Sequence, residues 1–302
     1  MNKKPVSNTM FKKSYNIAVL LATHKRTDAL SRSLFSLIDR AHDLDSIEFR
    51  FAIDNNDDIG LTHFTDVIQP ELDRRGINYE AIGFDPMGYL GLNRYYNTLA
   101  EGADADWLWV WCDDAICETD SWDQRIRECT GEFKLLKVHT HNEHPYSIFP
   151  IYPTEWHECL GYLSRHQLID AECSQIAYQL DLMKIIEVDV THDRADLTGN
   201  NADENANKKK YLEGNPSDPR DLYHETFALQ RLVDSDRLAV YMQSLGLDTS
   251  WWQGVKQGKN NAYDLMRKND PNDQIMQFDV VIDANGQKRI VKKNLKKDNN
   301  GA

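Results

Sequence analysis

Short apolar runs alternate with amphipathic segments along the first part of the chain. The runs have the length and composition of buried strands, and they cover Tyr15 to Ala22, Ile47 to Ile53, Asn78 to Ile82 and Trp107 to Cys112. The segments between them carry apolar residues at helical spacing, and they lie near residues 28–41, 62–75 and 93–103, with Gly76 as the expected end of the second. Strands that alternate with helices predict an α/β fold with a mostly parallel sheet flanked by helices.

The second half of the chain continues this pattern with longer gaps. Strands are expected at Phe133 to Val138 and Lys184 to Val190, with a helix from about Leu168 to Leu182 between them. Residues 218–245 have a helical pattern. The segment from Phe278 to Val291 predicts a hairpin that turns at Asn285-Gly286, a dipeptide typical of tight turns.

The composition is that of a globular protein without a membrane span. The chain has 302 residues, of which 41% are hydrophobic, and no stretch of 18 apolar residues occurs. The N-terminal apolar run is too short for a signal sequence. Five cysteines without a C-x-x-C pair fit reduced thiols in apolar segments. We therefore expect a soluble, cytoplasmic protein.

The charge of the chain is unevenly distributed. The net charge is −13, but residues 1–15 carry +4 and residues 287–302 carry +5, so the body carries −22. Such a surface repels nucleic acid, which is not expected as a partner, and it also repels polyanionic small molecules. A phosphate-bearing ligand would therefore need a cation at its site.

The apolar run from Trp107 to Cys112 ends abruptly in Asp113 and Asp114. Ligands of open α/β sheets bind beyond the carboxyl ends of the strands. Two carboxylates at such an end could hold a divalent cation. Aspartates are also common in solvated turns, so the run by itself leaves both interpretations open.

Four segments in order resemble the motifs of glycosyltransferase family 2, the inverting GT-A enzymes. They are the strand, loop and helix start Ala22-Thr-His-Lys-Arg, the segment Ile53-Asp-Asn-Asn56, the segment Gly88-Tyr-Leu-Gly-Leu-Asn-Arg94 followed by Ala100-Glu-Gly102, and the acid pair Asp113-Asp114. In two places the sequence departs from the pattern of the family. Asn93 precedes Arg94, whereas the family has arginine first, and Ala115 stands where the metal motif has its last acid.

The resemblance implies a GT-A-like fold and a nucleotide-diphosphate sugar as donor. Asp114 would bind Mn²⁺ or Mg²⁺, and Asp113 would contact the ribose or a water, although these two roles could be exchanged and Asp113 is also a candidate metal ligand. The other residues implied in nucleotide binding are Thr23, Lys25, Arg26, Asp54, Asn93, Arg94 and Arg194.

The family also implies a general base, a metal-binding histidine and a lid. The base would begin the helix near residue 168, which makes Asp170 the first choice and Glu172 and Glu158 the alternates. An acid at a helix start can instead only compensate the helix dipole. His192 would complete the metal site, or it is structural. Residues 199–210 are expected to form a lid over the donor.

Two further segments have weaker signals. His139, His141 and His144 have a spacing that could ligate zinc, but no expected strand or helix would make their rings converge. The segment from Pro150 to Ser164 combines aromatic and acidic residues as a sugar-stacking surface does. Tyr152 and Trp156 in it could equally belong to the core.

The sequence therefore predicts a metal-dependent enzyme that transfers a sugar to a glycan or another hydroxyl acceptor with inversion. The alternatives are a non-catalytic nucleotide-sugar-binding module and a sugar nucleotidyltransferase, although the glycine-rich loop typical of the latter is missing from Thr23 to Leu30.

The expected domains are a basic tail (1–15), a catalytic domain (16–211, with a nucleotide half 16–114 and an acceptor half with the lid 115–211) and a mixed α+β C-terminal extension (212–302). The extension is expected to be a separate module that could mediate homo-oligomerisation. The competing view is that its apolar residues complete the main core, namely Leu229, Leu232, Leu238 and Trp251.

Overall fold

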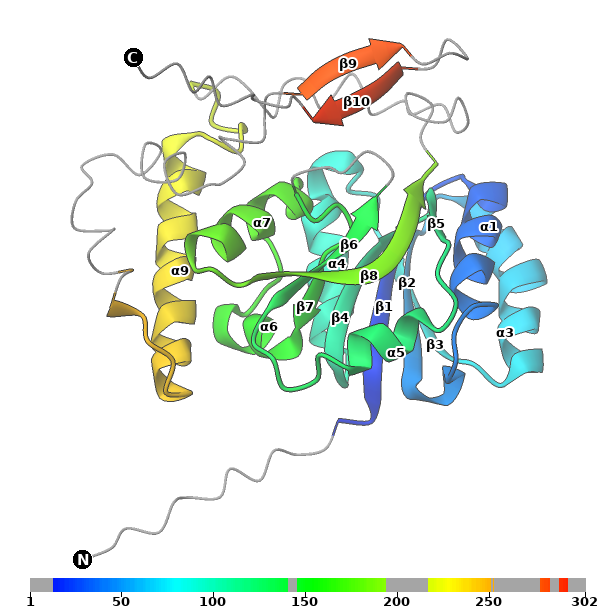
Figure 1. The fold of residues 1–302 in the computed structure, drawn as a ribbon. Helices are drawn as coiled ribbons and strands as arrows, with labels where there is room; N and C mark the ends of the chain where they lie inside the picture. The colour runs from blue at the N-terminus through cyan, green and yellow to red at the C-terminus, as the bar shows by residue number, and fades with distance from the viewer. Residues whose placement is uncertain are drawn as a thin grey trace, which may run out of the picture.

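An eight-stranded sheet runs through the middle of the molecule (Figure 1). The computed structural model describes residues 13–140, 146–193, 217–250 and 252, together with the backbone of residues 278–282 and 288–292. The strands of the sheet are β1 (Tyr15–Thr23), β2 (Ile47–Asp54), β3 (Asn78–Phe84), β4 (Ala105–Cys112), β5 (Ala115–Cys117), β6 (Leu135–Thr140), β7 (Ile151–Pro153) and β8 (Met183–His192). Their order is β3-β2-β1-β4-β7-β6-β8-β5.

The first four strands form the parallel half of the sheet, as the sequence predicts. β1 pairs in parallel with both β2 and β4, and β2 pairs in parallel with β3. Their observed bounds differ from the predicted ones by one or two residues. Because the strands are parallel, their carboxyl ends lie at one edge of the sheet, and the polar residues that follow them are brought together there.

The other half of the sheet is mixed. β7 pairs antiparallel with β4 and β6, β8 runs parallel to β6, and β5 pairs antiparallel with the end of β8. β5 and β7 have only three residues each. Neither strand was expected, because three residues are too few for a recognisable alternation of polar and apolar positions.

Helices cover both faces of the sheet (Figure 1). They are α1 (Thr27–Ile38), α2 (Asp58–His63), α3 (Gln69–Arg75), α4 (Leu92–Glu101), α5 (Trp122–Arg127), α6 (Thr154–Leu160), α7 (Ile169–Gln179) and α9 (Glu225–Ser244). Shorter helical turns lie at η1 (Leu44–Ser46), η2 (Phe64–Ile68) and η3 (Tyr89–Gly91). The run from α2 through η2 to α3 ends where expected, at Gly76, whose φ of 68° lies in the left-handed region that favours glycine.

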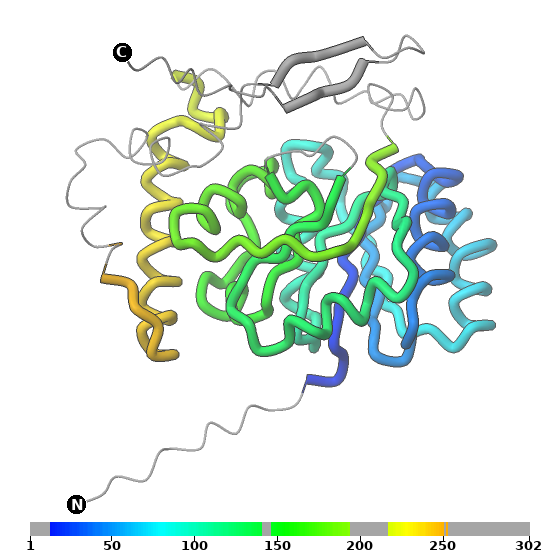
Figure 2. The backbone as a smooth tube through the Cα atoms, in the orientation of Figure 1, coloured from blue at the N-terminus to red at the C-terminus, as the bar shows by residue number. Residues whose placement is uncertain are grey.

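Two hydrophobic cores lie on the two faces of the sheet, and alternate residues of β1 point into each. Ile17 and Val19 pack in the core that includes residues of α1 and α3. Ala18 and Leu20 pack in the core that includes residues of α4, α6, α7 and α9. Figure 2 shows α9 (yellow) at one end of the molecule and α1 and α3 (blue and cyan) at the other. The sheet is therefore buried on both faces, as an apolar strand such as β4 requires.

Helix α9 belongs to the second core although it lies in the expected C-terminal extension. Leu238, Ala239, Met242 and Trp252 are buried there, and α9 contacts α6 and α7. Tyr152 and Trp156 are also buried in this core, which fits the core alternative for them. The boundary near residue 211 lies outside the described residues, and the domain division stays a prediction.

The expected C-terminal hairpin is present. Strands β9 (Phe278–Ile282) and β10 (Lys288–Lys292) pair antiparallel. Ile282 lies opposite Lys288, one residue off the register of a two-residue turn at Asn285-Gly286, which would pair Ile282 with Arg289. The turn itself lies outside the described residues.

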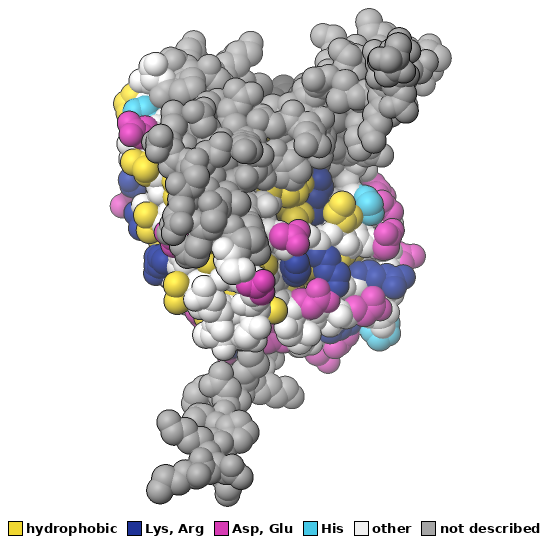
Figure 3. Space-filling model, turned by 60° about the vertical axis from the view of Figure 1, so that its left-hand side comes forward, with side chains coloured by type: hydrophobic (Ala, Val, Ile, Leu, Met, Phe, Trp, Pro, Cys, Tyr) yellow, Lys and Arg dark blue, Asp and Glu magenta, His cyan; other side chains and the backbone are white. Residues whose placement is uncertain are grey.

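The surface of the described part carries both signs of charge. On the face shown in Figure 3, basic and acidic side chains are interspersed, with small apolar areas between them. Each of the five cysteines is a free thiol. Among the described helices, none combines the length and the apolar character needed to cross a bilayer.

Candidate functional site

A cavity of about 720 Å³ opens at the edge of the sheet where the parallel strands end. Its walls are built from the ends of β1, β2 and β4, from η3 and α4, from the start of α7, and from the end of β8. Most of the residues that the sequence singles out lie in this cavity, namely Thr23, Lys25, Arg26, Asp54, Asp113, Asp114, Asp170 and His192. The site is therefore assembled from segments that are up to about 170 residues apart in the chain.

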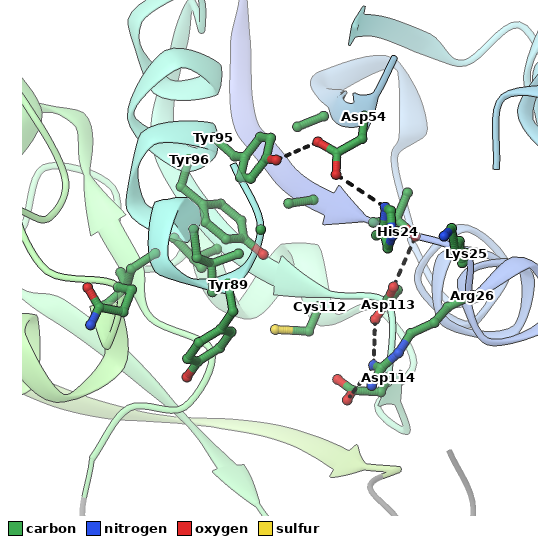
Figure 4. A pocket seen from close by; sticks show the side chains of 18 of the residues that line it. His24, Lys25, Arg26, Asp54, Tyr89, Tyr95, Tyr96, Cys112, Asp113 and Asp114 are labelled. Carbon is green, nitrogen blue, oxygen red and sulfur yellow. Dashed lines mark hydrogen bonds and ion pairs between the residues drawn. The ribbon is translucent and has the colours of Figure 1, made fainter. Parts of the chain in front are cut away.

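Asp113 and Asp114 lie side by side directly after β4, and each is only 7% exposed (Figure 4). Thr23 donates a hydrogen bond from Oγ1 to Asp113 Oδ2 over 2.9 Å. One guanidinium nitrogen of Arg26, Nη1, lies 3.0 Å from Asp113 Oδ1 and 3.0 Å from Asp114 Oδ2. The two acids are thus a paired, buried site and not a solvated turn.

The two buried carboxylates shift each other's pKa, and so do the cationic side chains beside them. Burial, and then repulsion from Asp114, raise the pKa of Asp113 to about 6, although Arg26 and Thr23 oppose this. Burial also acts to raise the pKa of Asp114, but His192 and Arg26 outweigh it and lower that pKa. For Arg26, burial opposes the charged form, yet the attraction of both carboxylates raises its pKa further. The site therefore needs positive charge between its acids.

His192 reaches the acid pair through the pairing of β5 with β8. The register places His192 opposite Ala115, and the backbone N–H of Asp193 donates to the carbonyl of Asp114 over 2.7 Å. His192 Nε2 lies 3.3 Å from Asp114 Oδ1. Ala115 is fully buried and holds this strand pairing. This explains the missing third acid, because a carboxylate at position 115 would be buried in the core.

The side chains around Asp114 suit a divalent cation chemically. Carboxylate oxygen and imidazole nitrogen are the ligands of manganese, and magnesium also takes carboxylates. The 3.3 Å between His192 Nε2 and Asp114 Oδ1 is short enough for both to bind one ion. Within the described ranges, no group of three or more His, Cys, Asp or Glu side chains is arranged to hold a metal. Asp114 and His192 would therefore need further donors, such as phosphate oxygens.

A second polar cluster forms around Asp54 at the end of β2 (Figure 4). Tyr95 donates a hydrogen bond from its hydroxyl to Asp54 Oδ1 and accepts one from the backbone N–H of Met87. His24 Nδ1 lies 3.1 Å from Asp54 Oδ2. Asp54 is 5% exposed, so His24 and Tyr95 present the polar groups at this end of the cavity.

The loop between β1 and α1 is held from behind by Asp57. The backbone N–H of Lys25 donates to Asp57 Oδ2 over 2.6 Å, and that of Gly60 donates to Asp57 Oδ1 over 2.9 Å. Asp57 is fully buried. Lys25 has a φ of 58°, which is rare for a residue with a side chain. This anchored turn places both Lys25 and Arg26 at the cavity.

The three candidates for the general base lie in different places. Asp170 is in the first turn of α7 and lines the cavity. Glu172 is 1% exposed and accepts hydrogen bonds from the backbone N–H groups of Arg165 and His166, each over 2.9 Å. Glu158 on α6 pairs with Lys13 over 2.9 Å, beside the start of β1 and so at the opposite edge of the sheet. Of these three, Asp170 is the one that lines the cavity.

Several other candidates lie away from the cavity or outside the described residues. Arg94 is exposed and does not line it, and Asn93 makes a 3.4 Å hydrogen bond to the carbonyl of Ser164. His139 is exposed, 3.7 Å from Glu187. Arg194, His141, His144, Trp251 and the expected lid at residues 199–210 lie outside the described residues.

The cavity also contains residues for which the sequence predicted no role. They include His24, Asn56, Tyr89, Tyr95, Tyr96, Cys112 and Gln167. His24 and Tyr95 had a usable signal, since His24 lies within the first of the four motifs and Tyr95 directly follows the third. Tyr96 donates to the carbonyl of Trp111 over 2.7 Å and so supports the end of β4.

Comparison with known proteins bears on the fold. No family model matches the chain, and no curated protein matches it in sequence. The structure resembles that of the mannosyltransferase PcManGT from Pyrobaculum calidifontis, in complex with GDP-Man and Mn²⁺, with a TM-score of 0.51, 8% identity and coverage of 89% of both chains. TarS residues 1–349 from S. aureus, in complex with UDP, match with a TM-score of 0.46, 13% identity and coverage of 93% of this chain and 97% of that one.

The fold is GT-A-like. At 8% identity, the likeness concerns the arrangement of strands and helices and does not carry a function with it.

Proposed function

We propose that this protein is a glycosyltransferase that uses a nucleoside-diphosphate sugar. The observation that carries the proposal is a single cavity in which Asp54, the Asp113–Asp114 pair and Asp170 lie at three different strand or helix ends. The cavity volume of about 720 Å³ is in the range of small-molecule sites. GDP-Man and Mn²⁺ in the structurally similar mannosyltransferase support the donor class by analogy of fold.

Each polar cluster has a role in this proposal. His24, Asp54 and Tyr95 bind the nucleoside through hydrogen bonds. Asp114 and His192, with Asp113 beside them, would hold Mn²⁺ or Mg²⁺. When bound, the cation supplies positive charge against the diphosphate as it leaves. Lys25 and Arg26 add charge at the loop before α1, where the acidic protein would otherwise repel the donor.

The transfer step is proposed to be a direct displacement with inversion. Asp170 takes the proton of an acceptor hydroxyl, and the acceptor oxygen attacks the anomeric carbon of the sugar. The bond from that carbon to the diphosphate breaks, and the nucleoside diphosphate leaves with its electron pair. A well-placed base contributes about 10²- to 10⁴-fold to such a step.

Donor binding and turnover can be tested separately. Calorimetry with UDP and with GDP, first with Mn²⁺ and then with EDTA, measures whether binding needs the cation. Release of nucleoside diphosphate from radiolabelled UDP-sugars and GDP-sugars measures turnover, either to acceptor hydroxyls or to water. We expect one nucleotide to bind only with Mn²⁺ and the matching donor to be consumed.

Two variants test whether metal-dependent nucleotide binding occurs at the Asp113–Asp114 pair. Asp114→Ala should lose at least about tenfold in nucleotide affinity, equivalent to about 1.4 kcal/mol. Asp120→Ala is the control, because Asp120 is 92% exposed, follows the end of β5 and does not line the cavity. Equal affinity in Mn²⁺ and EDTA would refute the metal dependence. Binding without turnover of any donor would favour the non-catalytic binding module.

A further inference from the structure

A single guanidinium nitrogen lies between the two carboxylates of the acid pair. Arg26 Nη1 is 3.0 Å from an oxygen of Asp113 and 3.0 Å from an oxygen of Asp114. A divalent ion shared by both aspartates would have to lie in the same place. The side chain of Arg26 comes from the loop before α1, and Figure 4 shows it reaching across to the pair.

Every carboxylate oxygen of the pair has a partner in the structure. Asp113 is contacted by Arg26 and Thr23, and Asp114 is contacted by Arg26 and His192. An incoming cation has to replace at least one of them. Thr23 is neutral, and His192 can itself be a ligand. Arg26 is positively charged and repels a cation at short range, so it is the partner that must leave.

We propose that Arg26 is the built-in counter-cation of the Asp113–Asp114 pair, that a divalent cation displaces it, and that the freed guanidinium then binds the diphosphate of the nucleotide. The inference rests on the proposed function only in taking the anion that the freed Arg26 binds to be a nucleotide diphosphate. Competition between Arg26 and the cation follows from the geometry of the pair alone.

The surroundings of the freed Arg26 side chain determine how strongly the binding of the cation affects the binding of the nucleotide. Arg26 is the N-cap residue of α1, a helix of 12 residues, and the N-terminus of a helix disfavours additional positive charge. With the cation bound, a freed Arg26 would face both this helix end and the ion. A diphosphate between them removes that repulsion and accepts paired hydrogen bonds from the guanidinium. The cation alone should bind weakly, and nucleotide should strengthen its binding, within the range of about 5- to 150-fold usual for coupled sites.

Mn²⁺ binding, measured from the electron paramagnetic resonance signal of the free ion, tests this. The full chain is titrated at pH 8 alone, with UDP and with GDP. Arg26→Met should bind Mn²⁺ alone about tenfold or more tightly than the wild type, and nucleotide should add less to it. Arg26→Lys, which keeps the charge, should remain near the wild type.

Arg32→Met is the matched control. Arg32 also extends from α1, is half exposed, and lies 3.0 Å from Asp193 Oδ2, next to the proposed ligand His192. Its loss changes the net charge by the same amount without emptying the space between Asp113 and Asp114. Mn²⁺ affinity in Arg32→Met should stay within about threefold of the wild type.

The outcomes separate this inference from the proposed function. Mn²⁺ affinity that is unchanged or lower in Arg26→Met overturns the inference, as does the absence of Mn²⁺ binding by both the wild type and this variant. If Arg26→Met does not fold, a wild-type protein whose Mn²⁺ affinity is the same with and without either nucleotide overturns it. Because no sugar donor is used, displacement of Arg26 can be established even if no transfer is ever detected.

Discussion

Two regions of this protein bury carboxylates in different ways. Asp113 and Asp114, in the wall of the cavity, are each 7% exposed, and Glu172, in the first turn of α7, is 1% exposed. The cavity pair is contacted by the side chains of Thr23, Arg26 and His192. Glu172 instead accepts from the backbone N–H groups of residues 165 and 166 and from the Ser164 hydroxyl.

The difference lies in what can move. A side-chain partner can rotate away and give its place to a ligand, whereas a backbone N–H leaves only if the loop unfolds. Burial alone does not distinguish the two regions, since it is the largest cause of the raised pKa of both Asp113 and Glu172. The kind of partner therefore separates a binding site from a structural anchor better than a shifted pKa does.

The largest expected effect comes from removing α9, which packs against α6 and against α7, the helix that carries Glu172. A chain ending at residue 211 should be insoluble, because Trp156, Leu160 and Ile176 of the second core lose the cover of Leu238 and Met242. A chain ending at residue 252 keeps this cover and should stay soluble. Expression of both, followed by gel filtration and circular dichroism, decides the matter. A soluble and folded 1–211 chain would instead make the C-terminal extension an independent module.

Asp170→Asn should lower transfer by about 10²- to 10⁴-fold while nucleotide affinity stays within a few-fold. Asp170 lines the cavity, and a base acts on the acceptor and not on the nucleotide. Glu158→Gln, at the exposed pair with Lys13, is the control and should keep full activity. Initial rates with the donor that the turnover assay selects provide the measurement. Normal turnover in Asp170→Asn would remove Asp170 from the mechanism.

Glu172→Ala should lower the free energy of unfolding by about 3 kcal/mol, because three donors lose their acceptor in a buried loop. Asp113→Asn should leave that free energy unchanged or increase it. The raised pKa of Asp113 means that its charged form is disfavoured in the folded protein, and the amide is uncharged. Urea unfolding at pH 7.5 compares the two. If Glu172→Ala and Asp113→Asn lose similar amounts of unfolding free energy, Glu172 is not a structural anchor distinct from the binding-site residue Asp113.

The smallest expected effect is a dependence of stability on pH at His166. Its Nδ1 accepts from the Leu168 N–H over 3.1 Å, and its Nε2 lies 2.9 Å from the Arg220 carbonyl. Burial lowers the pKa of His166 below the usual 6.5, so the ring is neutral in the fold. Stability is therefore complete above pH 6.5 and decreases as the pH falls below it, since the unfolded chain binds the proton more readily.

Urea unfolding at pH 7.5 and 5.5 measures this effect. The wild type should lose up to about 1.4 kcal/mol per pH unit through His166, and His166→Asn should lose correspondingly less. An identical pH dependence in His166→Asn and the wild type would show that this ring does not anchor the loop around Glu172.

Much of the framework was predictable from local pattern. Apolar runs of the right length predicted β1 to β4, and helical spacing predicted α1, α4 and α7, each close to its observed bounds. The abrupt end of the run at Cys112 also predicted that Asp113 and Asp114 follow a buried strand. Such patterns are readable because a strand or helix buried on one or both faces imposes its own period on consecutive residues.

The choice among the acids was decided by packing. Asp170 and Glu172 are two residues apart in the first turn of the same helix, so they point to different sides of it. The sequence offers both as a base. Only the position of α7 shows that one side faces the cavity and the other the loop at residues 164–166.

The sequence by itself determined the elements and the chemical types at their ends, and the tertiary structure decided which ends meet. Arg26 and Asp113 are 87 residues apart in the chain, and His192 reaches Asp114 only because β5 pairs with β8 opposite Ala115. Local periodicity contains no information on such pairings, which depend on strand order and register across the whole sheet. The bridge of Arg26 between two carboxylates is for this reason a property of the fold and could not be read from the chain.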